Sequence, residues 1–140
     1  MVAAALGALP VVHDPMWPIA AASIGEIVTA ALADPTALID ATNRLADVAR
    51  ANGCDTIKGA SPIGDSLAGA VASVHTIRLY DATTPATRVL VVDGVLATGA
   101  ALSLALEELK ASGHTNTTLA VLVDLGATGA AAAGQPVTEA

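Results

Sequence analysis

Aromatic residues are almost absent from this chain of 140 residues, which contains no Phe, one Trp and one Tyr. Proteins that bind single-stranded nucleic acid without sequence preference stack bases on aromatic side chains, and this sequence offers no such platform. The core has to be built from Val, Leu, Ile and Ala, because the 54% of apolar residues contains little else. A chain this apolar is expected to fold rather than to remain disordered.

Basic residues and cysteine are also scarce. Six Lys and Arg stand against thirteen Asp and Glu, which gives a net charge of −7 at pH 7. This balance argues against nucleic acid and anionic membranes as main partners. The single cysteine, Cys54, excludes an intrachain disulfide and favours a cytoplasmic location. We interpret Cys54 as a small residue at the start of a strand, with a reactive thiol as the alternative.

The sequence also lacks a membrane span and a metal-ligand pattern. The apolar stretch over residues 19–33 carries Glu26 and is shorter than the ~20 residues that a membrane-spanning helix needs. Residues 1–10 are apolar without the basic start of a signal peptide. His13, His75 and His114 are too widely spaced for a recognisable metal site. No G-x-S-x-G elbow or Ser-His-Asp arrangement is visible either.

Turn residues divide the chain into alternating helices and strands. Asp34-Pro35 breaks one helical pattern and begins another, with Asp34 as the cap. We expect helices over residues 35–52, 64–73 and 100–112, strands over 55–58, 75–80, 88–92 and 117–123, loops over 59–64 and 93–99, a turn over 81–87, and an edge strand near 135–137. This alternation predicts a three-layer α/β/α fold with a mainly parallel sheet. We expect one domain over residues 1–140, with an N-terminal loop and helix over 1–34 and a core over 35–140.

The segment over residues 88–110 carries most of the chemical information. A continuous β-branched apolar run ends at Asp93, a loop of small residues follows, and a helix then begins. This order directs backbone N–H groups and the positive end of the helix at one point, where a phosphate monoester can bind with few cationic side chains. Thr98 can add its hydroxyl, Gly99 allows close approach, and Asp93 can accept hydrogen bonds from a vicinal diol. The Walker and dinucleotide-binding patterns are missing, and an ordinary turn between strand and helix is the alternative.

This segment resembles the phosphoribosyl pyrophosphate (PRPP) signature of the type I phosphoribosyltransferase family, orotate-type members included. The shared pattern is four apolar residues, then Asp93, then three further residues and Ala-Thr-Gly. The resemblance implies that Asp93 is catalytic, holding the ribose hydroxyls and stabilising a cationic ribosyl centre. It also implies a loop that binds the 5′-phosphate. That loop consists of Val95, Leu96, Ala97, Thr98, Gly99, Ala100 and Ala101. The sequence departs from the family at Gly94, where a second acid is usual, and at Ala101, where Thr or Ser is usual; the latter loses one phosphate hydrogen bond, worth about 1–2 kcal/mol.

A second segment, Ile57-Lys58-Gly59, is similar to the hydrophobic-Lys-Gly turn of hypoxanthine-guanine members of the family. The resemblance implies a cis peptide between Ile57 and Lys58 and a pyrophosphate-binding loop. The loop residues are Lys58, Gly59, Ala60 and Ser61. It further implies Mg²⁺ bound through PRPP, with no direct protein ligand. A solvated lysine at the end of a strand is the alternative for Lys58. The resemblance covers roughly residues 35–137.

The long flexible loop that closes over the site in active members has no counterpart, because only residues 81–87 separate the expected strands. Trp17 and Tyr80 are the only aromatic candidates for contact with a base. Two functions therefore stand. The first is a phosphoribosyltransferase acting on PRPP and an orotate-like base; the second is an inactive module of the same fold that binds a phosphorylated nucleotide or sugar as a sensor or partner subunit. Small molecules are the expected partners in both cases, and Ala-rich helix faces favour a homodimer.

Overall fold

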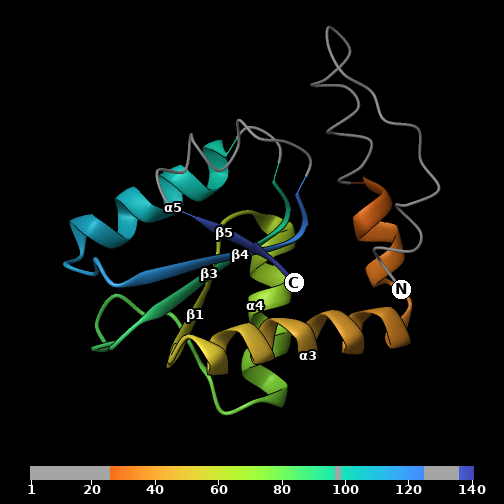
Figure 1. Cartoon of the computed structure of the whole chain (residues 1–140), viewed down its shortest axis with the longest axis horizontal. Coiled ribbons are helices and arrows are strands. Elements are labelled where there is room, and N and C mark those ends of the chain that lie inside the picture. Colours follow the sequence, from red (N-terminus) through yellow and green to blue (C-terminus); the bar gives the residue numbers. More distant parts are fainter. Residues whose placement is uncertain (1–25, 97–98, 125–135) are drawn as a thin grey trace, which may run out of the picture.

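The computed structural model describes residues 26–96, 99–124 and 136–140 of the chain. Residues 26–32 are helical. The elements that follow are α3 (Pro35–Ala51), β1 (Thr56–Gly59), α4 (Pro62–Val74), β2 (Arg78–Leu79), β3 (Val89–Leu96), α5 (Ala100–Ala111), β4 (Thr117–Asp124) and β5 (Val137–Glu139) (Figure 1). Within these ranges, no helix combines the length and apolarity that crossing a bilayer requires.

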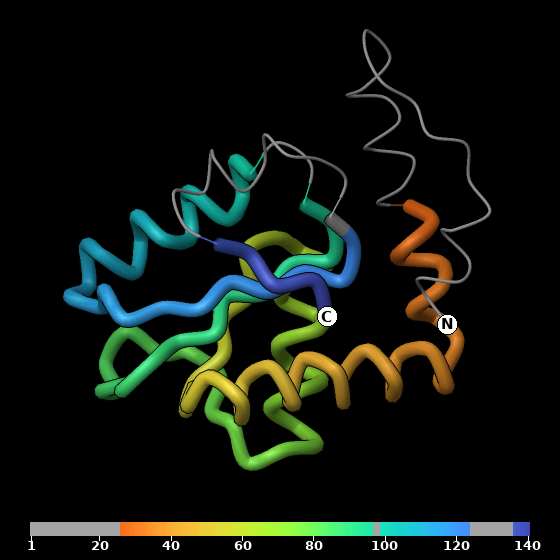
Figure 2. Tube along the Cα trace, viewed as in Figure 1, coloured from red at the N-terminus to blue at the C-terminus, as the bar shows by residue number. Residues whose placement is uncertain are grey.

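The five strands form one sheet in the order β2-β1-β3-β4-β5, and every pairing in it is parallel. The central strand is β3, which pairs with β1 up to Gly59↔Val92 and with β4 up to Leu96↔Asp124. The carboxyl ends of β1, β3 and β4 therefore lie at one edge of the sheet, as the trace in Figure 2 shows. In sheets of this kind ligands bind beyond the carboxyl ends of the strands.

Helices cover both faces of this sheet (Figure 1). One buried cluster joins α3 and α4 to side chains such as Leu90 and Val92 of β3. The other joins α5 to Val89 and Val91, which alternate with them along the same strand. Because β3 is buried on both faces, it reads as a continuous apolar run. The predicted three-layer α/β/α fold with a parallel sheet is confirmed.

The starts of the helices follow from local sequence. Asp34 caps α3, and its carboxylate accepts a hydrogen bond from the amide of Thr36 at 3.3 Å; Pro35 fills the first turn. Ser61 and Pro62 repeat this arrangement at the start of α4. Gly99 occupies the same position before α5. The N-cap of α5 thus lies three residues after the end of β3, at the edge of the sheet where the strands end.

The structure corrects three predicted boundaries. β3 continues to Leu96, so that residues 93–96 belong to a strand and not to a loop, because β4 is long enough to keep pairing with them. β2 has only two residues instead of the predicted 75–80, and both pair with the first half of the four-residue β1. Helix α4 begins at Pro62 instead of residue 64, because Ser61 caps it.

Candidate functional site

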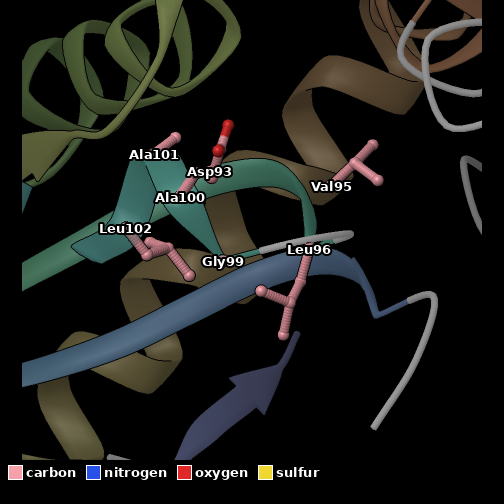
Figure 3. A pocket seen from close by; sticks show the side chains of 7 residues that line it. All are labelled: Asp93, Val95, Leu96, Gly99, Ala100, Ala101 and Leu102. Atoms are coloured by element: carbon pink, nitrogen blue, oxygen red, sulfur yellow. The ribbon is translucent and has the colours of Figure 1, made fainter. Parts of the chain in front are cut away.

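A hollow of about 90 Å³ lies between the carboxyl half of β3 and the start of α5 (Figure 3). It is lined by Asp93, Val95, Leu96, Gly99, Ala100, Ala101 and Leu102. A single water needs about 10–15 Å³ of such space, so the hollow is large enough for a small anion. Of the residues predicted to bind the ribose and its phosphate, all but two line it. Those two, Ala97 and Thr98, lie outside the described residues.

The start of α5 directs backbone amides at this hollow. Gly99 is the N-cap residue with φ 79°, a left-handed conformation that favours glycine, and it has no side chain with which to cap the helix. The first helical hydrogen bond runs from the Ser103 amide to the Gly99 carbonyl at 2.9 Å. The amides of Ala101 and Leu102 precede that bond and have no carbonyl partner within the helix. Together with the helix dipole, they favour an anion at this end.

Asp93 supplies the one carboxylate that lines the hollow, and its side chain points to the same side of the ribbon as that of Ala101, away from Leu96 (Figure 3). The residue is only 6% exposed. Its Oδ1 accepts hydrogen bonds from the Ser61 hydroxyl and, at 2.8 Å, from the Gly94 amide. Burial raises the pKa of Asp93, with a small addition from the charge of Asp65, and the two hydrogen bonds oppose that rise only in part.

The predicted pyrophosphate loop lies next to Asp93, but the Ala60 amide and the Ser61 hydroxyl are bonded within the protein. The amide of Ala60 donates to the carbonyl of Val92 at 2.9 Å. The hydroxyl of Ser61 donates to Asp93 and also accepts from the Gly64 amide at 3.1 Å, which makes Ser61 the cap of α4. This capping role was missed from sequence, although Ser followed by Pro at a helix start is its usual signal.

The structure does not bring Lys58 to the hollow. Its amine lies 3.3 Å from the carboxylate of Glu108 and 5.3 Å from the ring centre of Tyr80. Glu108 is seven residues along α5 from Ala101, which is roughly 10 Å at the rise of an α-helix. The ring of Tyr80 also meets His114 edge-on at 5.6 Å, so Tyr80 belongs to a side-chain cluster on the α5 face of the sheet.

Two other expectations from the resemblance can be compared with the structure. All peptide bonds among the described residues are trans, so the expected cis bond between Ile57 and Lys58 is wrong. Trp17, the other aromatic candidate for contact with a base, lies outside the described residues.

Neighbouring side chains occupy the space beside Gly94, the position at which the family signature usually has a second acid. A Cβ atom at this position would lie 2.7 Å from Cγ2 of Ile63 and 3.4 Å from Cγ1 of Val28. The first turn of α4 and the helix over residues 26–32 therefore fill the space that an acidic side chain would need. Asp93 is left without a neighbouring carboxylate on β3.

The connection between β2 and β3 is short and is tied down by its own hydrogen bonds. Asp81 accepts from the amide and the hydroxyl of Thr83, both at 2.9 Å. The guanidinium of Arg78 donates to the carbonyl of Pro85 at 2.6 Å. At the end of the connection, the amide of Thr87 donates to the Asp55 carboxylate at 3.0 Å. This segment forms a closed turn at the opposite edge of the sheet from the hollow, where the strands begin.

Among the residues that the structure describes, no three His, Cys, Asp or Glu side chains come together as a metal site. A single carboxylate does not hold a divalent cation alone, but Mg²⁺ is commonly held by one or two carboxylates together with substrate phosphates. The described residues therefore fit an ion that arrives with a diphosphate.

No family model matches the sequence, and no curated protein matches it. Solved structures do resemble the chain. Orotate phosphoribosyltransferase from Aeropyrum pernix is 24% identical with a TM-score of 0.63, over 76% of this chain and 71% of that one. Purine phosphoribosyltransferase from Pyrococcus horikoshii is 26% identical with a TM-score of 0.51, over 63% and 72%.

Adenine phosphoribosyltransferase from Thermoanaerobacter pseudethanolicus is 16% identical with a TM-score of 0.65, over 79% of this chain and 83% of that one. The three structures resemble this chain in fold, while their names give orotate, purine and adenine as the bases. Together with the element order and the position of Asp93, they lead to one conclusion: the chain has the type I phosphoribosyltransferase fold.

Proposed function

We propose that this chain is a phosphoribosyltransferase, an enzyme that transfers a 5-phosphoribosyl group from PRPP to a nitrogen atom of a base and releases pyrophosphate. The observation that carries the proposal is the hollow between β3 and α5, which combines a buried carboxylate with the amide end of a helix. Three of its seven lining residues, Gly99, Ala100 and Ala101, lie at the start of α5 and have small side chains or none, which leaves the backbone there open to a ligand. The fold shared with three phosphoribosyltransferases supports the same function.

The proposed roles follow from the positions of the groups. The amides that begin α5 bind the 5′-phosphate, with Gly99 allowing the ligand to approach the backbone closely. Asp93 accepts hydrogen bonds from the ribose hydroxyls, and its charge stabilises the positive ribosyl centre that develops as the bond to pyrophosphate breaks. The base nitrogen then forms the new bond to the same anomeric carbon. The Mg²⁺ that accompanies PRPP supplies charge neutralisation on the leaving pyrophosphate.

In this proposal the pyrophosphate lies against the loop from Lys58 to Ser61. The ammonium of Lys58 has to leave Glu108 to reach it. Breaking the Lys58–Glu108 ion pair costs little free energy, because the Glu108 side chain is 58% exposed and ion pairs of this kind contribute about 0–1 kcal/mol. We propose an orotate-like base on the basis of the late-strand sequence, and a panel of orotate, uracil, adenine and hypoxanthine tests it.

A second candidate has its own supporting observation. The connection between β2 and β3 is a closed turn, so a long loop that could exclude water from the reaction is missing at that point of the described chain. The paired state of Lys58 and the absence of a second acid at Gly94 favour the same alternative. In it, the chain binds a phosphorylated nucleotide or sugar without catalysis and acts as a sensor or a partner subunit.

Thermal unfolding and pyrophosphate release separate the two. A ligand at one hundred times its Kd adds about 2.7 kcal/mol to the free energy of unfolding, or roughly 5–10 °C for a chain of this size. We expect this shift with PRPP and Mg²⁺, and base-dependent release of pyrophosphate if the chain is an enzyme. Binding without release supports the module, and no shift with PRPP, ribose 5-phosphate or a nucleotide monophosphate rejects both candidates.

Asp93→Asn provides the matched variant for the ribose role. The amide keeps the shape of the side chain but places a donor or a neutral acceptor where the sugar hydroxyls bind. We expect ribose 5-phosphate to bind about tenfold more weakly, as befits one hydrogen bond to a charged group, while inorganic phosphate binds unchanged. Equal affinity of the variant for ribose 5-phosphate would show that Asp93 does not contact the sugar.

We also propose that the protein is a cytoplasmic homodimer and that residues 1–140 form one domain. The single cysteine, which is buried, supports a reducing compartment. Exposed apolar side chains, Ile39 and Leu104 among them, support self-association. Light scattering of the purified chain tests the dimer, and limited proteolysis tests whether residues 1–34 form part of the same domain.

A further inference from the structure

Ser61 links two parts of the site that belong to different elements. It is the N-cap residue of α4, and its hydroxyl oxygen accepts a hydrogen bond from the Gly64 amide at 3.1 Å. The same hydroxyl donates to Oδ1 of Asp93 in the middle of the sheet. The resemblance to phosphoribosyltransferases assigned Ser61 to the pyrophosphate, but the structure gives its hydroxyl other partners.

A serine hydroxyl has one proton to donate. Because the Ser61 hydroxyl donates its one proton in the hydrogen bond to the Asp93 carboxylate, it cannot donate to a diphosphate in the same arrangement. The Asp93 carboxylate in turn needs donors, since it is nearly buried and an unpaired carboxylate in such a place is unfavourable. The Gly94 amide, at 2.8 Å, is the second donor, and it binds the same oxygen.

Both donors therefore bind Oδ1 of Asp93. Among the described residues, none donates a hydrogen bond to Oδ2. We propose that Ser61 is a positioning residue, whose hydroxyl fixes the Asp93 carboxylate so that Oδ2 alone remains to accept a hydrogen bond from the sugar. The identification of a sugar as the ligand rests on the proposed function. The positioning of the carboxylate rests only on the two hydrogen bonds to Oδ1.

Positioning has a consequence that capping alone does not have. A hydrogen bond to the ionised form of a carboxylate lowers its pKa, so loss of the Ser61 hydroxyl raises the pKa of Asp93 further. Among the described residues, Asp65 of α4 is the charged group that acts on Asp93, and it acts in the same direction as burial. Within the described ranges, no cation acts on Asp93 to compensate when the hydroxyl is removed.

The first test needs no ligand. The carboxyl carbon of Asp93 is titrated by ¹³C NMR in the wild type, Ser61→Ala, Ser61→Thr and Asp34→Ala. Ser61→Ala is expected to move the midpoint to higher pH, while Ser61→Thr, which keeps a hydroxyl, restores it. Asp34→Ala removes the cap of α3 and controls for lost capping, so its midpoint is expected to match the wild type. An unchanged midpoint in Ser61→Ala would overturn the proposal.

The second test measures binding of ribose 5-phosphate and of inorganic phosphate to the same four proteins by calorimetry. Ser61→Ala is expected to bind ribose 5-phosphate about tenfold more weakly and inorganic phosphate as tightly as the wild type. Equal weakening for the two ligands would mean that Ser61 only caps α4. If the wild type binds neither, the proposed function fails, and the titration still decides the role of Ser61.

Discussion

Substitution by alanine is expected to have opposite effects on stability at two glycines of α4, Gly64 and Gly69. A Cβ atom at Gly64 would lie 2.5 Å from the Val92 carbonyl oxygen, 3.3 Å from Cα of Gly59 and 3.4 Å from Cα of Asp93. All three are backbone atoms, which cannot rotate away. At Gly69, five residues further along the helix, a Cβ atom would meet nothing within 4 Å.

Gly69→Ala is expected to stabilise the protein by about 0.5–1 kcal/mol, since alanine loses less backbone entropy in a helix. Gly64→Ala has the same helix gain, but the helix must move about 0.9 Å from the sheet to reach an ordinary contact of 3.4 Å. Overpacking of this kind costs about 1–3 kcal/mol. We therefore expect a net loss of about 1–2 kcal/mol for Gly64→Ala.

The difference between the two variants is about 2 kcal/mol, or about 4–8 °C in Tm for a chain of this size. Urea unfolding followed by circular dichroism measures it, with Gly69→Ala as the internal control for helix propensity. Gly64→Ala should also weaken ribose 5-phosphate binding, because α4 carries Ser61 away from Asp93 when it moves. If Gly64→Ala is as stable as Gly69→Ala, the close approach of α4 to β3 is not a feature of the folded protein.

Three further outcomes can be measured. Burial alone would raise the pKa of Asp55, but hydrogen bonds from backbone amides, that of Thr87 first, lower it. The stability that Asp55 contributes is therefore present above about pH 4 and is lost as the pH falls through the lowered pKa. The urea midpoints of wild type and Asp55→Ala should differ at pH 7 and converge in acid, and a gap that widens in acid would contradict this. Leu67→Ala leaves a cavity at a side chain that is 0% exposed and should reduce the free energy of unfolding by about 2–5 kcal/mol. A loss below about 1 kcal/mol would contradict the close packing at this position. Glu108→Gln releases Lys58 and, if the lysine binds pyrophosphate, should tighten pyrophosphate binding by up to about fivefold at low salt, whereas an unchanged affinity would leave Lys58 with a purely structural role.

The fold was predictable because its signals are local. Asp34-Pro35 and Gly113 mark helix ends through backbone chemistry that depends on a few residues. The run over residues 88–92 is apolar on both faces, which only a central strand of a parallel sheet requires. The end of that strand was not predictable, because it depends on how far β4 continues beside it.

The site was predictable in position and only partly in detail. Asp93 and the small residues before α5 follow from the sequence pattern, and they do line one hollow. The partners of Lys58 and Ser61 depend on residues far along the chain, Glu108 and Asp93, which no spacing rule connects to them. The space beside Gly94 likewise depends on Ile63 and Val28, whose approach to β3 is a result of tertiary packing.

Parallel pairing throughout the described sheet bears on how the chain folds. A hairpin can form from neighbouring residues, but each strand pair here joins segments that a helix or a longer connection separates. The central strand therefore gains both partners only after the loops around it have closed, and loop closure precedes the contacts that reward it. We expect folding in milliseconds or longer, with its slowest step set by the docking of β1 and β4 on β3.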